Sequence, residues 1–366
     1  MLKSRRGLLA AGLAVAVAGA FGVASTLQAD ADQIAPPTAA EKSAAVEAPP
    51  TPPATLPWGD RPKPIKRGKA GASAKSLRTA GLAAAANDTS GSVVAKPKEG
   101  PKGRFASLTD QLTTETTDIA PPEPPSDDDS DADQKVHYLY NVGAQAAVTD
   151  GVHANVTISK PKLEESDYHT LAELALQSGD KKQIVEVGWT VDRVVNGDDD
   201  PHLFVYHWVD KKSTCYNACG FQQYSANIKP GDTLPQDTVK KFGIQYFKNA
   251  WWIAYDSEWV GFFPESLWNK EGITFNKSGL IQVFGEVAST TTTPCWTQMG
   301  NGKKPKMNGS AAKLASVTYV NTTLVPELAI RTNNPAYKPY NAPTTLRTFQ
   351  FGGPGPCEPK DPEDEQ

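Results

Sequence analysis

The sequence predicts an all-β fold, an antiparallel β-sandwich of the jelly-roll or lectin-like kind, after a disordered N-terminal region. Short runs rich in Val, Ile, Tyr, Phe, Trp and Thr recur between turn signals from Val136 to Cys357. Such residues favour strands, and many short strands at this spacing are typical of sandwiches and barrels. Seven of the eight tryptophans lie in this part of the chain, whereas the part before it is poor in large apolar side chains.

The first residues have the layout of an export signal. Lys3, Arg5 and Arg6 form a basic start, and Gly7–Val23 is an unbroken run of small apolar residues. We therefore expect residues 1–31 to be a cleaved signal peptide, and the paired arginines are also compatible with a twin-arginine signal. A retained membrane anchor is the alternative, but the run is short and Ala/Gly-rich for a bilayer span. The sequence thus predicts a secreted protein that has no membrane contact after cleavage.

The segment that follows, residues 32–135, is dominated by Ala, Pro, Lys, Gly, Ser, Thr and Asp. Trp58 and Phe105 are its only aromatic residues, so it lacks the apolar surface that would offset the entropy of ordering it. We expect a disordered linker or pro-segment here. Residues 358–366 form a charged tail, which leaves residues 136–357 as one β-sandwich domain.

Within this domain, eight apolar or alternating runs are expected to be strands. One further segment, Glu164–Ser178, has the spacing of a helix through Leu171, Leu174 and Ala175. The expected strands are Gly151–Lys160, Gln183–Asp192, His202–Val209, Gly220–Ile228, Gly243–Tyr255, Glu258–Phe263, Leu280–Ala288 and Ala315–Asn321.

Composition and motifs exclude several classes of function. The formal net charge of −4 argues against nucleic acid as a partner. The sequence has no Gly-x-Ser-x-Gly elbow, no phosphate-binding glycine-rich loop and no His-x-x-x-His spacing, so serine-hydrolase and common zinc signatures are missing. The even count of four cysteines in an exported chain predicts two disulfides rather than a metal knuckle or a nucleophile. We expect no metal and no organic cofactor, and carboxylates remain as candidates for hydrolytic chemistry.

Two glutamates lie inside apolar β patterns. Glu186 is in Ile-Val-Glu-Val-Gly-Trp, and Glu286 is in Val-Phe-Gly-Glu-Val. A carboxyl group in such a setting is partly desolvated, which raises its pKa. Two of them facing each other can share a proton and activate a water, one as general base and the other as a hydrogen-bond donor to the carbonyl oxygen. The alternative is a pair of solvent-facing glutamates on half-buried strands.

An ordered series of sequence blocks lies between Val136 and Tyr319. The blocks are Glu186-Val187-Gly188-Trp189-Thr190-Val191, Asn196-Gly197-Asp198, Pro201-His202-Leu203-Phe204, Cys215-Tyr216-Asn217-x-Cys219-Gly220-Phe221, Trp251-Trp252-Ile253, Val260-Gly261-Phe262-Phe263-Pro264, Phe284-Gly285-Glu286-Val287 and Met299-Gly300-x-Gly302. This series resembles a neprosin domain. The resemblance implies a β-sandwich glutamic peptidase that cuts peptides or proteins at acidic pH, with a type member that prefers to cut after proline. The family's two catalytic glutamates correspond to Glu186 and Glu286.

The cysteines permit three connectivities. Cys215 and Cys219 are four residues apart and can close a tight loop, which would leave Cys295 and Cys357 to tie the C-terminal tail to the domain. We favour this pairing.

Aromatic side chains near the glutamates are candidates for substrate binding. Trp189 and Trp252 are candidates because aromatic faces suit proline rings and sugars, although core packing is the competing role. Gln222 and Tyr224 would point the same way along a strand and flank the cleft.

The sequence therefore predicts a secreted, monomeric endopeptidase whose activity rises below about pH 6, because both acids must not be fully ionised. Two alternatives stay open at this point. One is a carbohydrate-binding β-sandwich in which the glutamates only accept hydrogen bonds. The other is a glycoside hydrolase, which also needs two carboxylates.

Overall fold

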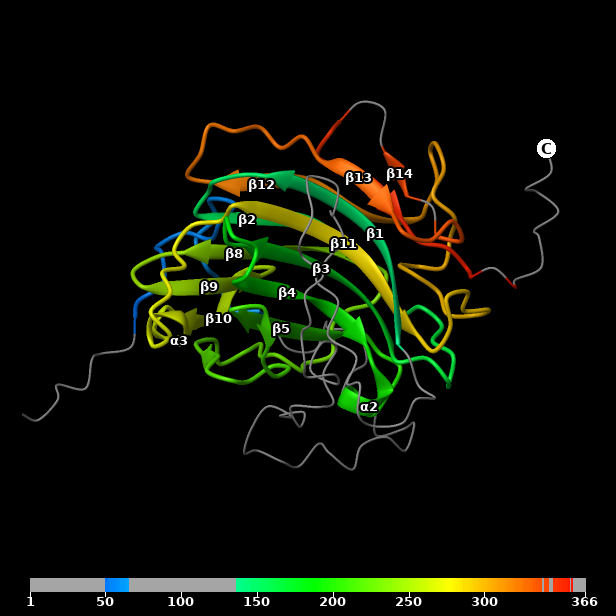
Figure 1. Ribbon diagram of the computed structural model, residues 1–366, viewed down its shortest axis with the longest axis horizontal. Helices are drawn as coiled ribbons and strands as arrows, with labels where there is room; N and C mark the ends of the chain where they lie inside the picture. The colour runs from blue at the N-terminus through cyan, green and yellow to red at the C-terminus, as the bar shows by residue number, and fades with distance from the viewer. Residues whose placement is uncertain (1–49, 66–135, 338, 342–344, 356, 358–366) are drawn as a thin grey trace, which may run out of the picture. The chain divides into compact units, whose positions relative to one another are not determined.

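Two antiparallel sheets packed face to face make up the described fold (Figure 1), which confirms the predicted β-sandwich. The computed structural model describes residues 50–65, 136–337, 339–341, 345–355 and 357. The expected signal peptide, most of the expected linker and the charged tail lie outside the described residues.

Sheet A has seven strands and sheet B has eight. The spatial order in sheet A is β13 (Ala329–Thr332), β1 (His137–Ala146), β11 (Leu280–Ser289), β3 (His169–Gln177), β4 (Ile184–Val191), β5 (His202–Val209) and β6 (Lys212–Ser213). The order in sheet B is β14 (Tyr340–Asn341), β15 (Phe349–Phe351), β12 (Ala312–Val320), β2 (Gly151–Ile158), β8 (Thr238–Tyr246), β9 (Ala250–Tyr255), β10 (Glu258–Pro264) and β7 (Gln222–Gln223). Two four-residue helices, α2 (Arg193–Asn196) and α3 (Ser266–Asn269), lie in connecting segments.

Most predicted strands are present, with two exceptions. The range Gly243–Tyr255 divides into the end of β8 and all of β9, because Lys248 and Asn249 adopt positive φ values of 46° and 61° in the turn between them. The range Gly220–Ile228 contains only the two-residue strand β7. A long strand that the sequence analysis did not list, β1, pairs along its whole length with β11.

The helix predicted over Glu164–Ser178 is wrong, because these residues contain the strand β3. All nine residues of β3 are buried, and the strand lies between β11 and β4. A strand covered on both faces carries apolar side chains at odd and even positions, so the expected alternation is lost. Leu171, Leu174 and Ala175 then mimic helical spacing by coincidence.

The main hydrophobic core fills the space between the sheets. Its tryptophans are buried with satisfied indole N–H groups: Trp189 donates to the carbonyl of Thr157 at 2.9 Å, and Trp251 donates to that of Phe275 at 2.8 Å. Because a buried polar group without a partner costs free energy, these bonds allow large rings inside the sandwich. The core therefore fixes which face of sheet A points inward.

The opposite face of sheet A carries a second buried cluster, which we call the aromatic face. It consists of Tyr138, Tyr140, Val142, Ala144, Leu171, Ala175, Ile184, Val195, Phe204, Tyr206, Trp208, Tyr216, Phe284 and Ala288.

Residues 50–65, which we call the proline-rich strap, lie on the outer face of sheet B, and the prediction of disorder is wrong for them. Leu56 is 2% exposed and packs with Trp252, Trp259 and other residues of β9 and β10. Composition alone suggested disorder because the strap cannot build a core by itself. Sheet B supplies the apolar surface that it lacks.

Both predicted disulfides are present in the structure. Cys215 and Cys219 join with Cα atoms 5.5 Å apart, and Cys295 and Cys357 join with Cα atoms 4.6 Å apart. Two such bonds fit an oxidising compartment. Among the described residues, no helix has the length and apolar character needed to span a bilayer.

Candidate active site

Strand register places both predicted glutamates on the aromatic face. Glu286 of β11 lies opposite Leu171 of β3, and Glu186 of β4 lies opposite Ala175 of the same strand. Positions 171 and 175 share a face because side chains alternate along a strand. The neighbouring residues Val185, Val187 and Val287 point into the core instead. Glu186 and Glu286 are both 0% exposed.

A third glutamate, Glu173, lies between them and was missed by the sequence analysis. It is opposite Phe284 of β11 and Gly188 of β4, so it is a diagonal neighbour of Glu286 on one side and of Glu186 on the other. Diagonal cross-strand neighbours have Cβ atoms about 7–8 Å apart or somewhat less, which long side chains can bridge. Glu173 is also 0% exposed. Three adjacent strands, seen side by side in Figure 1, thus carry one diagonal row of three buried acids.

A histidine, also missed, contacts the first of these acids. The Nε2 atom of His169 lies 2.7 Å from Oε1 of Glu286, and both side chains are almost completely buried. The second carboxylate oxygen of Glu286 accepts no hydrogen bond from the part of the chain that the structure describes. At the other end of the row, the indole N–H of Trp208 donates to Oε1 of Glu186 at 3.3 Å. His169 thus contacts Glu286, and the neutral indole of Trp208 contacts Glu186.

Gly188 leaves the space in which Glu173 sits. A Cβ atom built at Gly188 would lie 2.2 Å from the carbonyl oxygen of Ala172 and 2.7 Å from Cβ of Glu173. Backbone atoms cannot move aside cheaply, so only glycine fits here.

Gly188→Ala is expected to destabilise the domain by about 1–3 kcal/mol, as overpacking usually does, and to push Glu173 out of the row. Chemical denaturation would measure the loss of stability. Gly179→Ala is the matched control, because a Cβ atom there would meet nothing within 4 Å. Equal stability of the two variants would contradict the tight contact at position 188.

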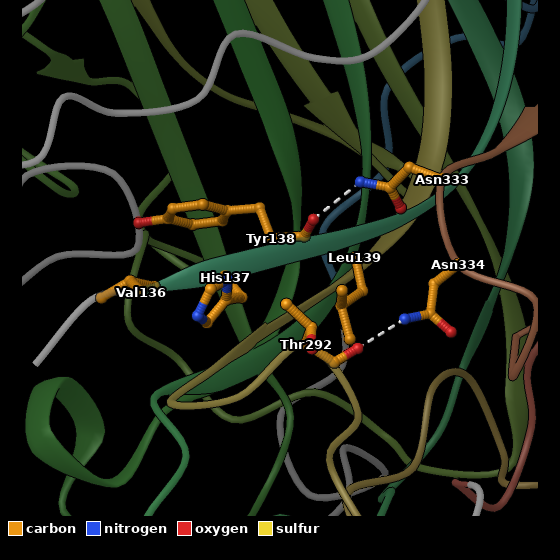
Figure 2. A pocket seen from close by; sticks show the side chains of 7 residues that line it. All are labelled: Val136, His137, Tyr138, Leu139, Thr292, Asn333 and Asn334. Carbon is orange, nitrogen blue, oxygen red and sulfur yellow. Dashed lines mark hydrogen bonds between the residues drawn. The ribbon is translucent and has the colours of Figure 1, made fainter.

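Beside the acid row, the open edge of β1 forms a small pocket (Figure 2). Strand β13 ends at Thr332, and the side-chain amide of Asn333 then takes the place of a strand backbone. It accepts from the N–H of Tyr140 at 2.7 Å and donates to the carbonyl of Tyr138 at 2.8 Å. The ring of Tyr138 stacks on Tyr140 at 6.4 Å and lies 6.3 Å from His169. The pocket is lined by Val136, His137, Tyr138, Leu139, Thr292, Asn333 and Asn334.

The four predicted substrate-binding residues are not brought to the glutamates. Trp189 points into the core between the sheets. Trp252 is buried on the outer face of sheet B under the strap. Gln222 and Tyr224 lie at the β7 edge of sheet B, where the exposed ring of Tyr224 meets Trp252 edge-on at 5.5 Å. The aromatic residues that share a face with the acids come mainly from β1 and β5, with Phe284 of β11 opposite Glu173.

The missed residues had a detectable signal. His169, Leu171, Glu173, Ala175 and Gln177 alternate along the chain, so a strand assignment would have placed His169 and Glu173 on one face. The helical interpretation of this segment concealed them. Among the described residues, no cluster of three or more His, Cys, Asp or Glu side chains could hold a metal ion.

Comparisons with solved structures give only weak likenesses. Scytalido-glutamic peptidase with a peptide-based transition state analog is 10% identical, with a TM-score of 0.34, covering 60% of this chain and 99% of that chain. SCP-B, an eqolisin-family peptidase in complex with the tripeptide Ala-Ile-His, is 10% identical, with a TM-score of 0.32 and the same coverage. A glycoside hydrolase family 16 endo-glucanase from Bacteroides ovatus is 13% identical, with a TM-score of 0.28, covering 44% and 70%. TM-scores this low carry no argument about function.

No curated protein matches the chain. The family model described as Neprosin, in contrast, matches residues 166–354, slightly more than half of the chain, and it spans β3, β4 and β11, the strands that carry the three acids. The resemblance found in the sequence is thereby confirmed. The chain belongs to the Neprosin family.

Proposed function

We propose that this protein is a secreted glutamic endopeptidase that cleaves peptide bonds at acidic pH, in which Glu186 and Glu286 activate a water. Membership of the Neprosin family supports peptidase function. The observation that carries the proposal is the row of three fully buried acids on one face of sheet A. Burying ionisable groups is costly, so their concentration outside the core is characteristic of a functional site.

The two outer acids differ in a way that suggests their roles. The Nε2 atom of His169 lies 2.7 Å from Oε1 of Glu286 and orients this side chain, which serves as general base on the water. Glu186, held by the indole of Trp208, supplies its proton to the carbonyl oxygen and stabilises the tetrahedral intermediate. The free oxygen of Glu286 is the atom available to the water.

We propose that part of the peptide substrate lies in the pocket of Figure 2. Tyr138 lines this pocket and also lies near His169, so a chain running along β1 would pass from the pocket to Glu286. The ring of Tyr138, which lines the pocket, is an aromatic surface of the kind that proline rings favour. A preference for cutting after proline would follow from such a surface.

The test is cleavage of a library of proline-containing peptides by the full-length chain at pH 4 and at pH 8, before and after incubation at pH 4. The Glu186→Gln/Glu286→Gln double variant is the blank. Cleavage at pH 4 that fails at pH 8 and is absent from the folded double variant is the expected result, and the cut sites report any proline preference. Undiminished cleavage at pH 8, or hydrolysis of glycans but not peptides, would contradict the proposal.

Glu173→Gln is expected to keep measurable activity but to move the alkaline limit of activity to lower pH, by about one unit. Glu173 lies one diagonal step from Glu186 and Glu286, so its carboxylate, when ionised, opposes loss of the last proton from the site, and glutamine cannot carry that charge. The measurement is kcat/KM from pH 3 to pH 7. A uniformly lower rate with an unshifted profile would mean that Glu173 only packs.

A further inference from the structure

The proline-rich strap lies against sheet B, on the face of the molecule that does not carry the acid row. Six of its sixteen residues are prolines. It adds no strand to the sheet, and its short turn is closed within itself, where Leu56 N–H donates to the carbonyl of Asp60 and Gly59 N–H donates to that of Leu56, both at 2.8 Å. The strap is therefore a docked peptide rather than a part of the sandwich.

Aromatic side chains of β9 and β10 form the seat of the strap. Leu56 enters a buried cluster made by Ala250, Trp252, Ala254, Trp259 and Phe262. The indole N–H of Trp259 donates to the carbonyl oxygen of Pro53 at 3.1 Å. An aromatic groove with a tryptophan donor is a common way to bind an extended proline-rich peptide, which has few conformations to lose.

Trp58 occupies a second seat on the neighbouring strands β2 and β8. Its ring lies 5.9 Å from that of His153 and 5.4 Å from Nζ of Lys241. A Cβ atom at Gly243 would lie 3.0 Å from Pro57 and 3.2 Å from Trp58. The glycine therefore allows the strap to pack closely against β8.

Polar contacts complete the seat towards the end of the strap. Asp60 lies 3.5 Å from Nζ of Lys241. The N–H of Lys63 donates to the carbonyl of Ser257 at 2.8 Å, and the N–H of Ile65 donates to Oε1 of Glu258. The domain thus accepts hydrogen bonds from backbone N–H groups of the strap. These bonds fix the position of the strap along the sheet, in addition to its apolar contacts.

We infer that the outer face of β9 and β10 is a binding site for proline-rich peptides, separate from the glutamates and occupied here by the chain's own strap. Seventy residues, 66–135, separate the strap from the domain in sequence. A linker of that length gives an effective concentration of about a millimolar at most, so the strap's own contacts must hold it in place. A proline-rich peptide in solution then competes for the same site, and it does so most strongly once the tether is cut.

The experiment uses the full-length chain with a site for a specific protease inserted after residue 100, in a Glu186→Gln/Glu286→Gln background that prevents self-cleavage. After cutting, the N-terminal piece is expected to co-elute with the domain in size-exclusion chromatography, and a synthetic peptide of residues 50–65 is expected to displace it. With Leu56→Ala/Trp58→Ala in the strap, the piece is expected to elute separately. A native piece that separates at once, or a variant piece that stays bound, would overturn the inference.

Two further arms test the chemistry of the site. A peptide with all six prolines replaced by alanine but with Leu56 and Trp58 kept should displace the piece much less well, and equal displacement would overturn the assignment to proline-rich ligands. Trp259→Phe keeps a ring but removes the donor to Pro53, and should weaken binding of the peptide about 5-fold. Trp296→Phe is the matched control. Trp296 lies in a different loop, where Nζ of Lys162 lies over its ring, and this substitution should not change the affinity for the peptide.

Discussion

Glu286→Gln is expected to lower kcat/KM for peptide cleavage at pH 4 by roughly 100- to 10,000-fold while the domain stays folded. Glutamine keeps the shape of the side chain and its contact with His169, but it cannot take a proton from water. Glu186→Gln should cause a loss of similar size, because an amide donates a weaker hydrogen bond than a carboxylic acid and cannot transfer its proton. The measurement is kcat/KM for the best peptide of the library.

Glu265→Gln is the matched control for both variants. Glu265 is a glutamate with 7% exposure that accepts a hydrogen bond from the Tyr246 hydroxyl at 2.6 Å, and it lies outside the aromatic face. This substitution should leave kcat/KM within a few-fold of the parent. If all three variants lose activity equally, the cause would be the replacement of any buried glutamate, and not the loss of chemistry at Glu186 and Glu286.

His207→Gln is expected to make the free energy of unfolding depend less steeply on pH in the acidic range. Burial lowers the pKa of His207 to about 3, since its ring is packed against Phe263 and Trp268. The folded state therefore keeps His207 neutral at pH values where the unfolded chain, with a pKa near 6.5, takes up a proton. Stability from this residue is fully present above about pH 6.5 and falls as the pH drops towards 3, by about 3 kcal/mol at pH 4.

The measurement is the free energy of unfolding at pH 7 and at pH 4 for parent and variant. The variant is expected to lose about 3 kcal/mol less than the parent between these pH values, even if its stability at pH 7 is lower. His153, whose pKa is lowered to about 4 by burial and then by the charges of Lys241 and Arg347, should give a smaller effect in His153→Gln. An unchanged difference between pH 7 and pH 4 in His207→Gln would contradict a neutral buried ring.

Proposed chemistry and stability thus oppose each other in this protein. The reaction needs protons on the acid row, whereas His207 makes the fold less stable as protons become abundant. The lower pH limit of activity should therefore be set by unfolding and the upper limit by the acids. His207→Gln should therefore extend the pH range of activity only at its lower limit.

The sequence predicted the strands best where β-branched and aromatic residues are frequent. The ranges that contain β2 and β4 are rich in such residues, whereas β3 consists largely of Leu, Ala, Glu and Gln, which favour helices. Glu186 and Glu286 were predicted from their apolar neighbours and from family resemblance. Their position on one face depends on how β11 and β4 each align with β3, and cross-strand register is not readable from one strand at a time.

The candidate substrate-binding residues illustrate the same limit. Trp189 adjoins the Glu-Val-Gly motif in sequence, but a step of three residues along a strand reverses the face, so it enters the core. Trp252 belongs to the other sheet. The strap could not be predicted from its own composition, because Leu56 is buried, and Trp58 partly buried, by residues of sheet B that come much later in the chain.

Each acid of the row belongs to a different strand, so the site exists only while two pairings, β11 with β3 and β3 with β4, keep their alignment. A slip of one residue in either pairing would turn a glutamate towards the hydrophobic core between the sheets, where burying a charge is costly. Catalytic competence is therefore coupled to correct strand alignment. Lengthening a surface turn should be harmless, but inserting one residue inside β3 should abolish folding and function together.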